Sequence, residues 1–211
     1  MINKVVMKLV IMISVMFALN IFNGLAQGAK DNLFEKLKAQ YSNLESISLN
    51  FTLNENKAVN GQLLAKKGNK YVLSIANRKI TCDGNTIWNY VPENKNVLIS
   101  KFESHNESAS IEKIFFEFTK NFKANNLYEP EEDNINSNMM LELVPVGEDG
   151  NDITMVRLVL NPGNLSIKRI VIIRNYAEES WNITNLKLNS QVADNKFVFK
   201  APEGVEIIDL R

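Results

Sequence analysis

Apolar and polar residues alternate along most of the chain, and a period of two predicts β-strands with one buried face. The first such run extends from Ile47 to Leu53, with polar residues at every second position. The same criterion predicts further strands at residues 59–66, 71–75, 79–82, 86–90, 96–100, 139–144, 153–160, 166–173, 181–188 and 197–200. Turn residues separate the strands, and Asp83-Gly84 in particular favours a tight hairpin. About eleven short strands at this spacing predict a large antiparallel sheet.

Two segments have helical spacing instead. In residues 31–44, Asp31 is a candidate N-cap, and Leu33, Leu37 and Tyr41 recur on one side. In residues 111–122, apolar side chains recur at i, i+3, i+4, i+7 and i+11, namely at Ile111, Ile114, Phe115, Phe118 and Phe122. Both helices are available to cover one face of the sheet. The periodicity leaves two alternatives open, a solidly packed interior and a ligand cavity, and it does not fix which strand phase faces inward.

The N-terminal 26 residues have the three-part pattern of a secretory signal peptide. Lys4 and Lys8 precede an apolar run over residues 9–22, and Gly24-Leu25-Ala26 places small residues before a cleavage site. The alternative, a membrane anchor, needs about 20 unbroken apolar residues, and this run is shorter. We therefore expect an exported protein whose residues 27–211 form a single domain.

The composition excludes several common classes of protein. The 24 basic and 24 acidic residues balance, which argues against a protein built to hold nucleic acid. With one cysteine and one histidine, the chain has no intramolecular disulfide and no multi-His metal site. We expect no metal and no cofactor.

The remaining polar candidates do not form an active site. His105 lies in a polar stretch and is interpreted as a solvated surface residue. The acidic run at residues 129–133 lacks the alternating spacing and glycine of a calcium loop. Cys82 is interpreted as a small packed side chain. Because no nucleophile elbow, phosphate loop or paired carboxylates appear, we expect that the protein is not an enzyme.

Four stretches in a consistent order carry a resemblance to a known family. They are LESISLNFT at residues 44–52, GQLLAKKG at 61–68, ITCDGNTIWNYVP at 80–92, and FVFKAPEGVEIID at 197–209. Across essentially the whole mature chain, this sequence resembles the periplasmic outer-membrane lipoprotein carriers, the LolA-like proteins. The resemblance implies an unclosed antiparallel β-barrel covered by a helical lid.

The resemblance also implies a function without catalysis. Such a protein receives acylated lipoproteins from an inner-membrane ABC-type transporter, escorts them across the periplasm, and delivers them to an outer-membrane acceptor. We expect a monomer that binds no nucleic acid. The lid would be the helix over residues 111–122. The cavity wall would consist of apolar residues from the inward strand phases, namely Leu49, Phe51, Leu63, Tyr71, Leu73, Trp88, Trp181 and Ile183.

The second stretch departs from the family pattern, which usually runs G-x-L-W-x-K-R-P with an arginine associated with holding the lid closed. Lys67 stands at the arginine position, Gly68 at the proline and Leu64 at the tryptophan. Lysine lacks the planar, bidentate contacts of arginine. Lys67 is therefore only a candidate latch.

Other functions remain open beside the carrier hypothesis. One is a periplasmic regulatory domain that senses a lipid or a protein on the same scaffold. Another is a solid-core interaction protein, which an internal pocket below about 300 Å³ would favour. The aromatic stripe at 111–122 is compatible with either a lid or ordinary core packing.

Overall fold

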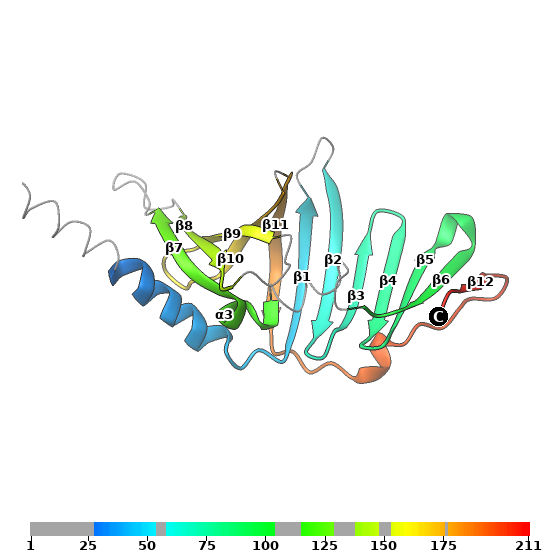
Figure 1. The fold of residues 1–211 in the computed structure, drawn as a ribbon. Coiled ribbons are helices and arrows are strands. Elements are labelled where there is room, and N and C mark those ends of the chain that lie inside the picture. The colour runs from blue at the N-terminus through cyan, green and yellow to red at the C-terminus, as the bar shows by residue number, and fades with distance from the viewer. Residues whose placement is uncertain (1–27, 54–57, 104–114, 129–137, 148–152, 176) are drawn as a thin grey trace, which may run out of the picture.

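The computed structural model describes residues 28–53, 58–103, 115–128, 138–147, 153–175 and 177–211. These residues form one twelve-stranded sheet in the order β12-β6-β5-β4-β3-β2-β1-β11-β10-β9-β8-β7 (Figure 1). The strands are β1 (Ser46–Leu53), β2 (Val59–Lys66), β3 (Lys70–Ile75), β4 (Arg78–Asp83), β5 (Thr86–Val91), β6 (Asn96–Lys101), β7 (Phe122–Tyr128), β8 (Met139–Pro145), β9 (Ile153–Leu160), β10 (Ile167–Arg174), β11 (Ala177–Leu188) and β12 (Glu206–Asp209). The mainly β, unclosed sheet agrees with the prediction. The signal peptide predicted over residues 1–26 lies outside the described residues.

Strand register places the alternating apolar residues on one face, which we call the inner face. Leu49 of β1 pairs with Leu63 of β2, and Leu63 pairs with Leu73 of β3. On the other side of β1, Phe51 pairs with Ile183 of β11. Antiparallel partners point to the same side of a sheet, so the apolar phase of each strand continues into the next.

A helix over residues 28–41 packs against the inner face near β7–β10 (Figure 1). Leu33, Phe34, Leu37 and Tyr41 are its buried side chains, and the residues between them are mostly exposed. The prediction of 31–44 therefore found this helix and its buried stripe. The helix ends earlier than predicted, and Leu44 is buried in the turn that leads to β1.

The prediction of a helix over residues 111–122 is wrong at its C-terminal end. Ile111 and Ile114 lie outside the described residues. Beyond them, the helix α3 spans only Phe118–Asn121, and Phe122 begins the edge strand β7. Phe122 and Ala124 pair with Pro145 and Leu143 of β8 and point to the inner face. Pairing with β8 thus overrides the helical spacing of Phe118 and Phe122.

The predicted strand at residues 197–200 is also wrong. A short 3-10 helix, η3 (Asp194–Phe197), occupies its start, and the final strand is β12, parallel to β6. Phe197 is fully buried and the Phe199 ring lies 5.3 Å from the Tyr90 ring, centroid to centroid. The hydrophobic residues of this segment therefore pack through their side chains, Phe197 in the interior and Phe199 against Tyr90, and do not pair in a strand.

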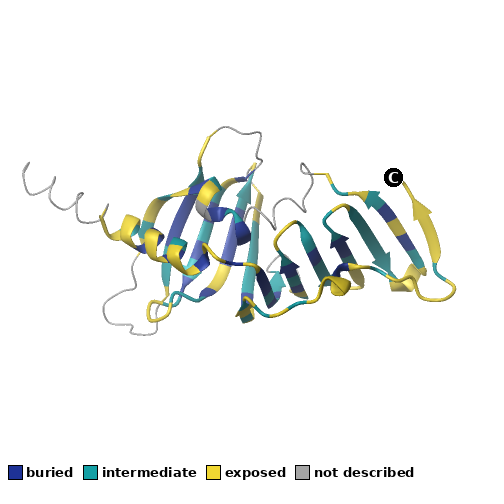
Figure 2. Ribbon diagram, turned by 90° about the horizontal axis from the view of Figure 1, so that it is seen from below, coloured by how far each residue is buried: buried dark blue, intermediate teal, exposed yellow. Residues whose placement is uncertain are grey.

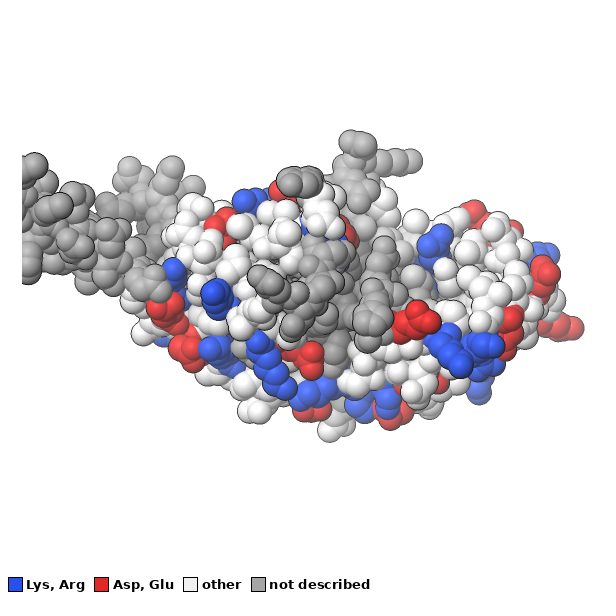
Figure 3. All heavy atoms as spheres, in the orientation of Figure 1, with Lys and Arg blue, Asp and Glu red and all other residues white. Residues whose placement is uncertain are grey.

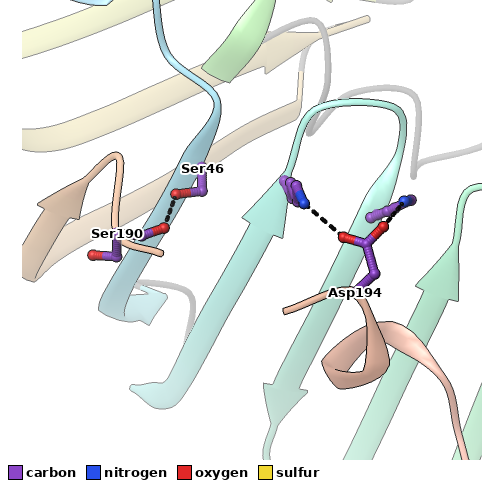
Figure 4. A network of polar contacts seen from close by, with 5 residues as sticks. Ser46, Ser190 and Asp194 are labelled. Atoms are coloured by element: carbon purple, nitrogen blue, oxygen red, sulfur yellow. Dashed lines mark hydrogen bonds and ion pairs between the residues drawn. The ribbon is translucent and has the colours of Figure 1, made fainter. Parts of the chain in front are cut away.

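Residues 189–205, which we call the strap, cross the outer face of β1–β6. Close to its start, the Ser46 hydroxyl donates to the Ser190 carbonyl at 2.6 Å (Figure 4). Further along, the Asp194 carboxylate accepts from Lys66 Nζ at 2.6 Å and from Lys70 Nζ at 2.7 Å. Because Lys66 and Lys70 lie on neighbouring strands, one carboxylate ties the β2–β3 hairpin to the strap.

The sheet therefore has two differently covered parts. We call β1 and β7–β11 the packed half, since the helix over residues 28–41 covers its inner face. We call β2–β6 and β12 the open half, since the strap covers its outer face. Figure 2 shows buried residues gathered in the strands near the helix and exposed residues along all of β12. Charges of both signs are interspersed on the face seen in Figure 3.

Candidate functional site

The inner face brings together seven of the eight predicted wall residues. Leu49, Phe51, Leu63, Tyr71 and Ile183 are buried, whereas Leu73 and Trp181 are half-buried. The register of β1, β2, β3 and β11 places them on one continuous surface. Their role as a ligand wall stays a prediction.

Trp88 lies on the opposite face and is the exception. It pairs with Thr81 of β4 and Ile99 of β6, whereas the inner face of β4 carries Ile80 and Cys82, which pair with Leu73 and Tyr71. Assigning Trp88 to the inner wall is an error of one residue in strand phase. In β5 the inner positions belong to Ile87 and Asn89, so an aromatic residue marks the outer phase.

Two aromatic rings of the packed half stack on the inner face, next to the first strand of the open half. Phe51 and Trp181 stack with centroids 4.5 Å apart and planes 25° apart. Phe51 pairs across the ladder with Gly61, and its ring occupies the space where a Cβ on Gly61 would stand. Glycine is required here for the close approach of a ring to the backbone. The Trp181 indole is held in turn by a hydrogen bond to Glu179.

Aromatic side chains from two segments form a cover over the packed half. The Phe118 ring lies edge-on to Phe34 at 6.3 Å and to Tyr41 at 5.8 Å. Phe115 and Phe116, just before α3, are also buried. We call Phe34, Tyr41, Phe115, Phe116 and Phe118 the aromatic cover. Offset edge-to-face contacts of this kind each contribute about 0.5–1.5 kcal/mol beyond their buried area.

Among the described residues, the cover packs closely on the strands β8–β10. A gap of about 10 Å³ remains between Phe118, Phe122 and the inner-face residues of β8–β10. That is roughly the smallest space that holds one water molecule. The sequence analysis did not single out the strand residues that fill this region, although their alternation was visible in the sequence: Leu141, Leu143, Val156, Leu158 and Ile170.

Burial changes the chemistry of two polar groups in the interior. Burial raises the pKa of the Tyr41 hydroxyl to about 12, an effect that the Ile167 backbone partly opposes. Burial likewise raises the pKa of the Cys82 thiol to about 11, while the Gly84 N–H donates to the sulfur at 3.4 Å. A thiol with a raised pKa is a poor nucleophile. Cys82 is fully buried, as a packed side chain should be.

Lys67, the candidate latch, makes its described ion pair with Glu45 and not with a residue of the aromatic cover. Lys67 Nζ lies 3.3 Å from Glu45 Oε1, in an exposed ion pair at the end of the β1–β2 ladder. A latch role for Lys67 stays a prediction. His105 and the acidic run at 129–133 lie outside the described residues.

The described part of the chain offers neither a metal centre nor a membrane span. There, no group of three or more His, Cys, Asp or Glu residues is placed to hold a metal ion. Within the same residues, no helix is long and apolar enough to cross a membrane.

The described residues thus form a sheet with an apolar inner face, part of which a helix and the aromatic cover overlie. Residues 42–200 match the family described as outer membrane lipoprotein carrier protein LolA. The chain belongs to this family, which is a family of carriers. The comparison with curated proteins finds no match.

Solved structures resemble this chain at low sequence identity. An uncharacterized conserved protein from Thermus thermophilus is 8% identical, with a TM-score of 0.52, and the match covers 84% of this chain and 97% of that one. The LolA superfamily protein NE2245 from Nitrosomonas europaea is 15% identical, with a TM-score of 0.43 and coverages of 82% and 97%. LprF from Mycobacterium bovis is 8% identical, with a TM-score of 0.45 and coverages of 79% and 95%.

Proposed function

We propose that this protein binds the acyl chains of lipoproteins on its inner face and escorts them through the periplasm from the inner to the outer membrane. An inner-membrane ABC-type transporter would load it, and an outer-membrane acceptor would unload it. The signal peptide would direct export and be cleaved after residue 26, and the carrier would act as a monomer. The observation that carries this proposal is an apolar face continuous across the sheet beneath a small, separate aromatic cover.

The energetics suit a carrier. Hiding an acyl chain from water is worth about 0.8 kcal/mol per CH₂, or of the order of 10 kcal/mol for one long chain. The gap of about 10 Å³ beneath Phe118 accommodates no such chain, so a chain that enters there would displace the cover. The Phe118 contacts with Phe34 and Tyr41 would be exchanged for contacts with the ligand. This exchange keeps the net affinity moderate, which allows delivery.

The open half supplies the surface onto which a ligand can extend. Leu73, Ile80 and Ile87 lie on its inner face, are half-buried, and continue the wall beyond Leu63. A chain that displaced the cover would contact these residues without further rearrangement of the sheet. No step of this cycle needs a catalytic group.

The direct test measures binding of a synthetic triacylated lipopeptide by the exported protein, with the same peptide lacking acyl chains as reference. We expect binding of the acylated peptide alone. Phe118→Asp should reduce binding at least tenfold, because it places a charge in the cover. Val198→Asp, at an exposed apolar position, is the matched control and should bind normally.

A second variant tests whether reduced binding reflects a changed binding surface or a loss of folding. Leu73→Asp alters the half-buried part of the wall and leaves the packed half intact, so it should also reduce binding while circular dichroism is unchanged. Equal binding of acylated and unacylated peptides would overturn the proposal. Release of lipoproteins from spheroplasts separates a carrier from a sensing domain, since a sensor would bind the lipopeptide without releasing lipoproteins.

A further inference from the structure

A groove of about 410 Å³ lies on the surface between the helix over residues 28–41 and the start of β7. Its volume falls in the range of about 300–1,000 Å³ typical of ligand sites. The apolar part of its lining consists of Phe34, Phe122, Ala124 and Val146. Val146 is 52% exposed, so this apolar lining reaches the solvent.

The groove is connected to the interior through one side chain. Phe122 lines both the groove and the gap of about 10 Å³ beneath the aromatic cover. Phe34 likewise lines the groove while its ring contacts Phe118 of the cover. A rotation of Phe122 would therefore join the surface groove to the space between cover and sheet.

The charges around the groove are uneven. On the helix side, Lys38 is neutralised by Glu35 at 2.7 Å and lies over the Phe34 ring at 4.7 Å. On the β7 side, Lys120 and Lys123 line the groove and are exposed. Neither ammonium group makes a hydrogen bond or ion pair with another described residue. Counting Asp31, the lining holds three lysines and two carboxylates, so the uncompensated positive charge lies on the β7 side.

We propose that this groove binds the anionic head end of an acylated ligand, with Lys120 and Lys123 contacting the charge and the chain passing Phe122 toward the inner face. The inference rests on the proposed function, because it presumes that an acyl chain enters beneath the cover. The charge would be either a lipid phosphate or a carboxylate next to the acylated cysteine of a lipoprotein. Both sources present an anion at the end of an apolar chain.

Isothermal titration with lysophosphatidylglycerol and lysophosphatidylcholine of equal chain length tests the head-end preference. We expect the anionic lipid to bind about five- to tenfold more tightly, as two exposed charge contacts allow. K120E/K123E should abolish the preference, because it weakens the anionic lipid more than the zwitterionic one. K168E/K187E makes the same change in net charge at exposed positions away from the groove and should retain the preference. Val146→Trp fills the groove and should weaken both lipids.

A second arm distinguishes the two sources of charge. Triacylated lipopeptides with Asp or Asn after the acylated cysteine are compared on the same variants. If the Asp lipopeptide binds more tightly than the Asn lipopeptide, and K120E/K123E removes the difference, the bound charge is a carboxylate. If only the lysolipids show a preference, the bound charge is a phosphate. Either result supports the groove. The groove is overturned, with acyl binding intact, if the two lysolipids bind equally and the Asp and Asn lipopeptides also bind equally. An equal loss of the preference in K168E/K187E has the same consequence. Failure of every acylated probe to bind overturns the proposed function and this inference together.

Discussion

The packed half and the open half use the same alternating strands, yet they are stabilised from opposite sides. In the packed half, Leu141 and Leu160 on the inner face are fully buried under a helix and an aromatic cover. In the open half, burial on the inner face declines from Leu63 at 1% exposure to Leu98 at 37%. Its outer face is the better covered one: Phe197 of the strap is fully buried, and Val97 and Thr81 of the outer phase are buried as well. Alternation thus determines which residues share a face, but not which face is covered.

Replacing Phe197 by Ala should have the largest effect on this comparison. Phe197 is a fully buried side chain of the strap, and removing such a ring costs about 3–5 kcal/mol. We expect hydrogen exchange to accelerate in β3–β6 while β8–β10 stay protected. Val198→Ala, next to it and 49% exposed, is the control. Uniform acceleration across all strands would show that the halves unfold as one unit.

The next largest difference should appear between Leu141→Ala and Leu73→Ala. Leu141 is fully buried in the packed half, so its truncation should lower the free energy of unfolding by about 2–5 kcal/mol. Leu73 is half-buried in the open half, and we expect about half that loss in urea denaturation. Equal losses would mean that the inner faces of the two halves are equally enclosed.

The smallest effect concerns the ion pairs of the strap. Lys66 and Lys70 lower the pKa of Asp194 from 3.8 to about 2. Because the folded pKa lies below the unfolded one, the stabilisation is present above pH 4 and is lost as the pH falls toward 2. Asp194→Asn should lower the Tm at pH 7 by a degree or two and reduce the difference in Tm between pH 5 and pH 2.5.

Glu203→Gln, another exposed position on the same segment, serves as the control for that measurement. An unchanged acid dependence in Asp194→Asn would show that the carboxylate contributes nothing to holding the strap.

Sequence periodicity predicted ten of the twelve strands and the first helix, because each has a buried face with a regular period. The periodicity did not predict β7, because its Asn-rich sequence alternates poorly. Pairing with β8, and not a local pattern, forms this strand. The periodicity missed the strap for a similar reason, as Phe197 and Asp194 act through partners distant in sequence. Seven of the eight predicted wall residues share the inner face, and Trp88 lies on the other, where a single shift in phase changes the face.

The position of β1 between the two halves has a consequence for folding kinetics. The strands β2–β6 form a meander of neighbouring hairpins, and so do β7–β11, so each is able to assemble through local contacts. Only the β1–β11 ladder, where Ile47 meets Leu188, unites them into one sheet. Closing so long a loop is entropically costly and slows folding. Pairing at this ladder should therefore be the late event in refolding, after both meanders have formed.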